Sequence, residues 1–380
     1  MNAVRGAGWV LALALTLGAC GDDTPDASLA AEDAGLSRLE LIGKSLFFDT
    51  SLSNPPGQSC ASCHDPQRGF AGNFGSGAGV PFAADGVTLG VRNTPTAAYA
   101  RFAPGFSVIA QGARQVARGG QFLDGRAASL EEQAGMPLFA AGEMNLASPA
   151  ELAARLASAP YAAQLRAEFG DGIFANPALV LQAVTSAIAA FERSDRFAPF
   201  SSRFDRWLAG EATLNSLESE GLALFGDPSK GNCASCHAFD ATSRDPADLL
   251  FTDFRYYSLG VPRNPRIPAN ADPAFFDLGL CGPRRQSVAD DGLCGAFKVP
   301  TLRNVAMKQA FMHNGVFSRL RDAVEFHARP DLAAADMPAA YRVNIAPAAG
   351  PLGLEDREID AITAFLGALD DGSGPAGVSR

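Results

Sequence analysis

The chain has 380 residues, of which 47% are hydrophobic and 19% are charged, with a formal net charge of −10. This composition provides a sizeable core and excludes a wholly disordered chain, a collagen and a polytopic membrane protein. The acidic excess repels phosphate, so we expect no nucleic-acid partner. The length is typical of two domains.

The first segment predicts export. Residues 8–17 are apolar but too few to span a bilayer, and the sequence LGAC, which ends at Cys20, resembles a bacterial lipobox. We therefore expect a lipoprotein signal peptide over residues 1–20 and a periplasmic protein whose only membrane attachment is a lipid anchor on Cys20. An ordinary signal peptide, which would leave a soluble periplasmic protein, is the alternative. The polar and acidic residues 21–35 predict a flexible tether.

The N-terminal half predicts helices around one haem motif. Helical spacing of apolar residues over 36–48 leads into the sequence CASCH, which begins at residue 60. A Gly/Pro-rich stretch over 69–95 has no clear period and is expected to be a long loop. Further helices are predicted over 127–135, 149–169 and 177–193, the last two opened by Ser-Pro and Asn-Pro pairs.

The C-terminal half repeats this order. A helix predicted over 213–225 leads to a second CASCH sequence, which begins at residue 233. Residues 243–298 are rich in Pro, Asp and Gly and look irregular, and closing helices are predicted over 318–328 and 355–369. The repetition predicts a mainly α fold with long irregular loops. It contains two cytochrome-c-like haem domains in tandem, over residues 36–202 and 203–372.

The two CxxCH motifs carry most of the chemical information. In such a motif two thiols add to the vinyl groups of one haem, and the adjacent histidine becomes the proximal iron ligand. The motifs lie too far apart for the two halves of a zinc ribbon, and a thioredoxin-like CxxC needs no histidine. We expect two covalently bound haem c groups, held by Cys60, Cys63, His64, Cys233, Cys236 and His237.

Two further cysteines, Cys281 and Cys294, lie close together in the irregular segment. In an oxidising compartment they are expected to form a structural disulfide that closes a short loop. Two unpaired thiols are the alternative.

Several segments together resemble the bacterial dihaem cytochrome c peroxidase family, which includes the MauG-like enzymes. They extend over nearly the whole chain after the tether. The segments are RNTPT at 92–96, DGRA at 124–127, LEEQA at 130–134, FER at 191–193, VPTLRNV at 299–305 and FMHNG at 311–315.

The resemblance implies a peroxide-cleaving haem on His64 and an electron-transfer haem on His237. It also implies that Glu143 and Gln133 are the acid/base and orienting groups on the distal side of the first haem. A carboxylate there moves a proton between the two peroxide oxygens as the bond between them breaks. An amide there holds the peroxide in place.

Three departures from the family pattern bear on the subtype. No histidine lies between His64 and His237, whereas conventional members cap the resting peroxide haem with one, so an open, five-coordinate haem is expected. His327 stands where the peroxidases carry a Met and MauG a Tyr, and it is expected to be the second axial ligand of the C-terminal haem. Leu123 replaces the Trp that the family places between its haems. Leucine cannot be oxidised as a relay, so charge sharing would need direct tunnelling or Phe122.

The family also binds calcium between its domains. By resemblance, the ligands here are the Asn93 side chain and the backbone carbonyls of Lys308 and Ala310.

The sequence therefore predicts a MauG-like enzyme that reacts with hydrogen peroxide and oxidises a protein substrate. The first alternative is a cytochrome c peroxidase, in which a small cytochrome is the electron donor. The second is a non-enzymatic dihaem electron carrier, which the open haem argues against.

Overall fold

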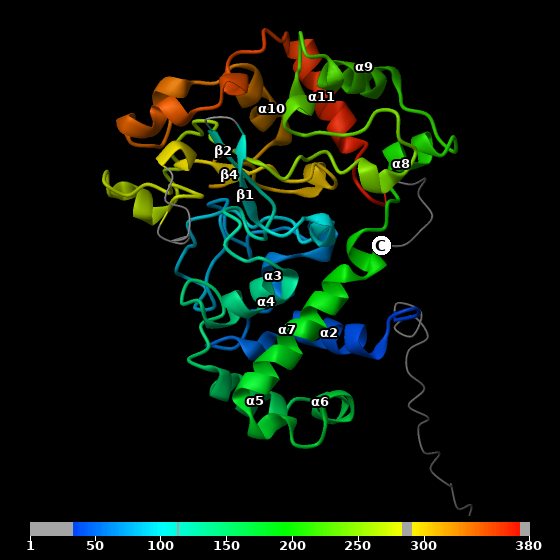
Figure 1. The fold of residues 1–380 in the computed structure, drawn as a ribbon, viewed down its shortest axis with the longest axis vertical. Coiled ribbons are helices and arrows are strands. Elements are labelled where there is room, and N and C mark those ends of the chain that lie inside the picture. The colour runs from blue at the N-terminus through cyan, green and yellow to red at the C-terminus, as the bar shows by residue number, and fades with distance from the viewer. Residues whose placement is uncertain (1–32, 112–113, 283–290, 373–380) are drawn as a thin grey trace, which may run out of the picture. The chain divides into compact units, whose positions relative to one another are not determined.

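Two pairs of crossing helices organise the computed structural model, which describes residues 33–111, 114–282 and 291–372 (Figure 1). The expected signal peptide, its Cys20 and most of the expected tether lie outside these residues. Among the described residues, no helix has the length and apolar character needed to cross a membrane.

The first pair joins α2 (Arg38–Phe48) and α7 (Pro177–Arg193). α2 begins at a capping box formed by Ser37 and Glu40, and α7 begins at Asn176, whose side chain accepts two backbone N–H groups. The helices cross at Gly43, where an added Cβ would lie 2.0 Å from the carbonyl oxygen of Ala187. Glycine is therefore what allows this close approach.

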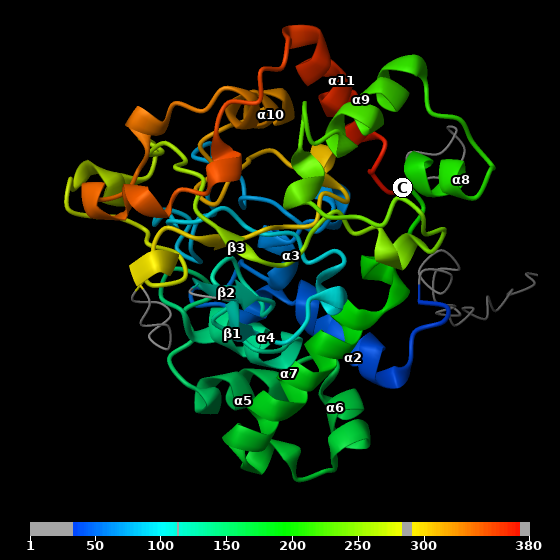
Figure 2. The same ribbon diagram turned by 45° about the horizontal axis from the view of Figure 1, so that its top comes forward.

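The second pair joins α9 (Ser216–Gly226) and α11 (Asp356–Gly367). They cross at Gly221, where an added Cβ would lie 2.0 Å from the carbonyl oxygen of Ala361. The first helix of each pair precedes a haem motif, which forms the short helix α3 (Cys60–Cys63) or the turn η6 (Cys233–Ser235). Both views show α2 beside α7 and α9 beside α11 (Figures 1 and 2). The mainly helical fold with tandem cytochrome-c-like units is thus confirmed.

The other helices are α4 (Leu130–Phe139), α5 (Pro149–Ala157), α6 (Ala162–Phe169), α8 (Arg203–Leu208) and α10 (Leu320–Ala328). The single helix expected over 149–169 was wrong, because the chain turns between α5 and α6, where Pro160 has no N–H to continue the helix. The helix expected over 127–135 begins later, at its cap Ser129, and runs further, to Phe139.

Two small antiparallel sheets complete the described fold: β1 (Ser107–Gln111) with β2 (Arg114–Arg118), and β3 (Tyr256–Tyr257) with β4 (Phe297–Lys298). The first hairpin was not predicted, because every residue of β1 is exposed and its sequence carries no alternation of buried and exposed side chains. The second sheet places Tyr257 opposite Phe297.

The core of the second helix pair is aromatic. Phe225 and Phe365 pack on Phe251, and Phe204 of α8 joins the same cluster. We accordingly keep the proposal that the C-terminal domain begins at residue 203.

Candidate haem sites

The N-terminal cavity has a volume of about 480 Å³ and is lined by Cys60, Cys63 and His64. The Nδ1 atom of His64 lies 3.0 Å from the carbonyl oxygen of Phe70, which fixes the ring and leaves Nε2 available as a ligand. Burial lowers the pKa of His64, which favours the neutral imidazole that an iron ligand needs. Burial also raises the pKa of the Cys63 thiol to about 12.

The expected distal residues line the same cavity. α4 carries Gln133 and Pro137, and the turn that follows it carries Glu143. The backbone N–H of Glu143 donates to the carbonyl of Ala140 at 2.9 Å, and its own carbonyl accepts from Ala84 at 2.8 Å. The structure therefore brings Gln133 and Glu143 to the cavity of His64, although they are far from it in sequence.

The C-terminal cavity, of about 250 Å³, is lined by Cys233, Cys236 and His237. The Nδ1 atom of His237 lies 3.1 Å from the carbonyl oxygen of Phe251, the same arrangement as in the first cavity. Burial lowers the pKa of His237 to about 4 and raises that of Cys233 to about 12.

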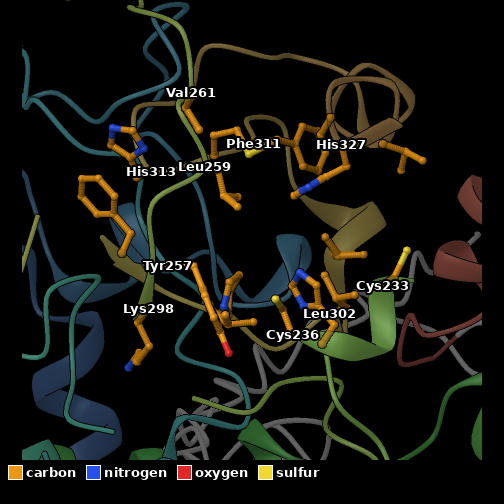
Figure 3. A pocket seen from close by; sticks show the side chains of 18 of the residues that line it. Cys233, Cys236, Tyr257, Leu259, Val261, Lys298, Leu302, Phe311, His313 and His327 are labelled. Carbon is orange, nitrogen blue, oxygen red and sulfur yellow. The ribbon is translucent and has the colours of Figure 1, made fainter. Parts of the chain in front are cut away.

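His327 projects from α10 into this second cavity. Leu320 and Val324, one and two turns earlier, line it too, as helical spacing predicts. Burial is the main cause that lowers the pKa of His327 to about 4. Figure 3 shows the ring of His327 on the side of the cavity opposite Cys236. The location suits a second axial ligand.

One wall separates the two cavities. Leu123 lines both of them, as do segments 93–96 and 298–301. Among the described residues that line both cavities, none has an aromatic side chain. Phe122 lines the N-terminal cavity alone, with the guanidinium of Arg126 lying 3.5 Å from its ring centre.

Beside this wall lies a buried ion network that sequence reasoning did not find. Arg92 contacts Asp277 at 2.6 and 2.7 Å and Asp124 at 2.7 Å, and Asp124 also pairs with Arg126. Burial opposes ionisation of Asp277, but its hydrogen bonds and charge contact with Arg92 prevail and hold its pKa at about 2. His313 stacks on Phe297 at 3.8 Å next to this network.

Three other buried groups were also missed. Glu192 of α7 is 4% exposed and lines the N-terminal cavity, and its Oε2 atom has no hydrogen-bond partner among the described residues. Burial raises the pKa of this carboxyl to about 8. Lys298 and Lys308 are half-buried in the cavity walls, and burial lowers the pKa of each to about 8. Burial depends on tertiary packing, so the sequence alone does not predict these pKa shifts.

The segment expected to bind calcium is occupied by internal contacts. The Asn93 Nδ2 atom donates to the carbonyls of Ala310 at 2.9 Å and Met312 at 3.1 Å, so one expected ligand oxygen is already used. The Lys308 Nζ atom donates to the carbonyl of Thr94 at 3.2 Å. This cation links the two segments that calcium was expected to join.

Cys281 and Cys294 form a disulfide with a Cα–Cα distance of 4.9 Å. The bond lies near Asp277 in the chain and is distant in sequence from both haem motifs. It closes a loop and belongs to neither cavity lining.

Comparison with known proteins agrees with these features. A family model described as di-haem cytochrome c peroxidase matches residues 37–213. The chain is 36% identical over 377 residues to the methylamine utilization protein MauG of Paracoccus denitrificans, with 94% of each chain covered. It is 30% identical to the cytochrome c551 peroxidase of Nitrosomonas europaea, with 81% of this chain and 77% of that one covered. The crystal structure of the diheme peroxidase BthA from Burkholderia thailandensis matches with a TM-score of 0.82 and 40% identity, with 88% of this chain and 86% of that one covered.

Proposed function

This chain belongs to the di-haem cytochrome c peroxidase family, and on that basis we propose that it works in the MauG-like manner, with an open N-terminal haem site. It is a dihaem peroxidase-type oxidoreductase that reacts with peroxide, and its electrons come from a protein donor or substrate. Residues Cys60, Cys63 and His64 would hold the first haem and Cys233, Cys236 and His237 the second. When bound, the haems supply an iron that cleaves the peroxide bond and an iron that carries single electrons.

The lining of the N-terminal cavity carries the proposal. His64 is the one histidine among the described residues that line it, so no second imidazole is in place to cap the haem. The distal side instead presents Gln133 and Glu143. We assign Glu143 to take a proton from the inner peroxide oxygen and return it to the outer one, and Gln133 to orient the peroxide. Peroxide would therefore react without prior reduction.

The second cavity is arranged for electron transfer. His237 and His327 both present neutral imidazoles to it, and two such ligands close an iron to peroxide. We propose bis-histidine ligation here, which gives a lower potential than the His/Met pair.

Export belongs to the proposal as well: attachment through Cys20 on the periplasmic side of a bacterial envelope, with a soluble periplasmic protein as the alternative. Calcium, expected at Asn93, is left out of the proposal. A divalent ion there would lie against the Lys308 ammonium and compete with the Asn93 amide for the Ala310 carbonyl.

A second candidate is a cytochrome c peroxidase that reduces peroxide to water with electrons from a small cytochrome. It is supported by the 30% identity to the cytochrome c551 peroxidase of Nitrosomonas europaea. The shared lining, whose described residues include no aromatic side chain, does not separate the two candidates. In a non-enzymatic carrier both haem irons would have two protein ligands. The N-terminal cavity does not favour this, because its described lining contains His64 as its one histidine.

The test is to add hydrogen peroxide to the fully ferric protein and follow absorption and EPR. We expect a high-spin signal from the N-terminal haem and a low-spin one from the C-terminal haem, with the high-spin signal lost on mixing. Glu143→Gln should slow that loss by about 10²-fold or more. His327→Ala should change the resting low-spin signal of the C-terminal haem to a high-spin one. A reaction that begins only after one haem is reduced would favour the conventional peroxidase, and inertness in both states would favour the carrier.

A further inference from the structure

We propose that Tyr257 and Asp253 form a redox relay through which electrons from the protein partner reach the C-terminal haem. The inference rests on the proposed function and adds a route for the electrons. The wall between the cavities has no aromatic side chain among its described residues. A protein partner is too large to enter either cavity, so its electrons need another route to the haem.

Tyr257 lies where such a relay is needed. It is half-buried on β3 and lines the C-terminal cavity together with Cys236. The backbone N–H of its partner Asp253 donates to the carbonyl of Cys236 at 3.0 Å. Figure 3 shows its ring beside Cys236, with the hydroxyl directed away from His327. The side chain thus extends from the haem attachment point toward the side of the cavity away from the distal ligand.

Asp253 supplies the proton acceptor that tyrosine oxidation requires. The Tyr257 hydroxyl donates to its Oδ2 atom at 2.8 Å, while its Oδ1 atom accepts the backbone N–H of Arg255 at 2.8 Å. A phenol that loses an electron becomes strongly acidic, so a carboxylate already in its hydrogen bond takes the proton without rearrangement.

The step balances as a one-electron, one-proton exchange. Tyr257 gives one electron to the C-terminal site after peroxide has oxidised the protein, and its phenolic proton passes to Asp253. A neutral tyrosyl radical and a protonated carboxyl remain. The partner then gives one electron to the radical, and the proton returns from Asp253 to the phenolate oxygen. Two such cycles supply the two electrons that one peroxide consumes.

The chain contains a matched pair that lacks these properties. Tyr99 lines the N-terminal cavity and donates to Asp371 at 2.8 Å, but it is 2% exposed and cannot meet a partner. An arginine lies near each phenol, Arg303 at 5.3 Å from the Tyr99 ring centre and Arg255 beside Tyr257. Exposure is therefore what separates the two pairs.

The other aromatic residues that line the C-terminal cavity are Phe225, Phe297 and Phe311, which have no ionisable proton and resist oxidation. The neighbouring Tyr256 donates to the Gly119 carbonyl at 2.6 Å, and a carbonyl is not a base. Among the described residues that line this cavity, Tyr257 is therefore the one suited to the relay.

The experiment mixes the ferric holoenzyme with peroxide, freezes it within milliseconds and records EPR for an organic radical. A nitroso spin trap followed by peptide mapping locates that radical. A reduced basic c-type cytochrome, suited to the acidic chain, is the donor probe for the return of electrons. The variants are Tyr257→Phe, which keeps the ring, Asp253→Asn, which keeps the shape, and Tyr99→Phe as the control.

We expect the trapped radical on Tyr257 in the wild type and in Tyr99→Phe. It should be lost in Tyr257→Phe, while the N-terminal high-spin signal still disappears at the wild-type rate. Asp253→Asn should slow cytochrome oxidation about 10²-fold, the scale of a lost proton acceptor. A radical on Tyr99, or unchanged cytochrome oxidation in Tyr257→Phe, would overturn the relay alone. Failure of the ferric protein to react with peroxide would overturn the proposed function as well.

Discussion

At the scale of single residues, the motif-borne groups were predictable and the buried partners were not. Spacing and residue type point to His64, and the resemblance points to Glu143, because haem attachment and peroxide chemistry need those groups. Glu192, Lys308 and Tyr257 look ordinary in the sequence. Their chemistry follows from burial and from neighbours distant in the chain, which only the folded structure supplies.

Glu192 gives a prediction about pH. Its ordinary pKa is 4.5, and burial raises it to about 8 in the folded protein. Between these values the folded protein holds a proton that the unfolded chain has released. Raising the pH through this window therefore lowers the free energy of unfolding. Glu192→Gln, which stays neutral, should remove this part of the pH dependence. Guanidinium melts of both proteins from about pH 5 to about pH 8 measure it, and parallel curves would contradict it.

At the scale of elements, strong local signals were read correctly. The helix over 177–193 was predicted with its observed bounds, because Asn176 and Pro177 mark its start and its apolar face is continuous. The hairpin of β1 and β2 was missed because its first strand is exposed throughout. The close helix crossings were also missed, because a glycine inside a helical pattern does not reveal which carbonyl it approaches.

Those crossings predict how helix α9 tolerates alanine. Gly221→Ala gains helix propensity, worth about 1 kcal/mol, but its Cβ would meet the Ala361 carbonyl at 2.0 Å. The clash should prevail and lower the free energy of unfolding by about 1–3 kcal/mol. Gly226→Ala, in the same helix with no atom within 4 Å of the new Cβ, is the control and should be neutral or stabilising. Equal free energies of unfolding for the two variants would show that the helices move apart at the crossing without cost.

At the scale of the whole molecule, Lys308 joins a segment of the C-terminal half to one of the N-terminal half. Its ammonium contacts the Thr94 carbonyl, and the next links between the same segments come from Asn93. The Lys308 side chain is part of every copy of the protein, whereas a bound ion depends on its concentration. The fold should therefore hold its inter-haem wall in calcium-free buffer.

This makes calcium independence a prediction. Elemental analysis of purified holoenzyme should find no stoichiometric calcium, and a chelator should leave the absorption spectrum unchanged. Lys308→Met keeps the length of the side chain without its charge. It should remove the contact with the Thr94 carbonyl and lower the guanidinium concentration at the midpoint of unfolding. One tightly bound calcium per chain, whose removal alters the haem spectrum, would show that Lys308 does not replace the ion.

The shared wall also bears on the history of the chain. Each repeated unit brings its own helix pair and haem motif, but segment 298–301 lines the N-terminal cavity and segment 93–96 lines the C-terminal one. Duplication of an ancestral one-haem gene would copy the helices and leave the wall to evolve afterwards, across both copies. Either half produced alone would therefore leave its own haem cavity open on the side that the other half covers.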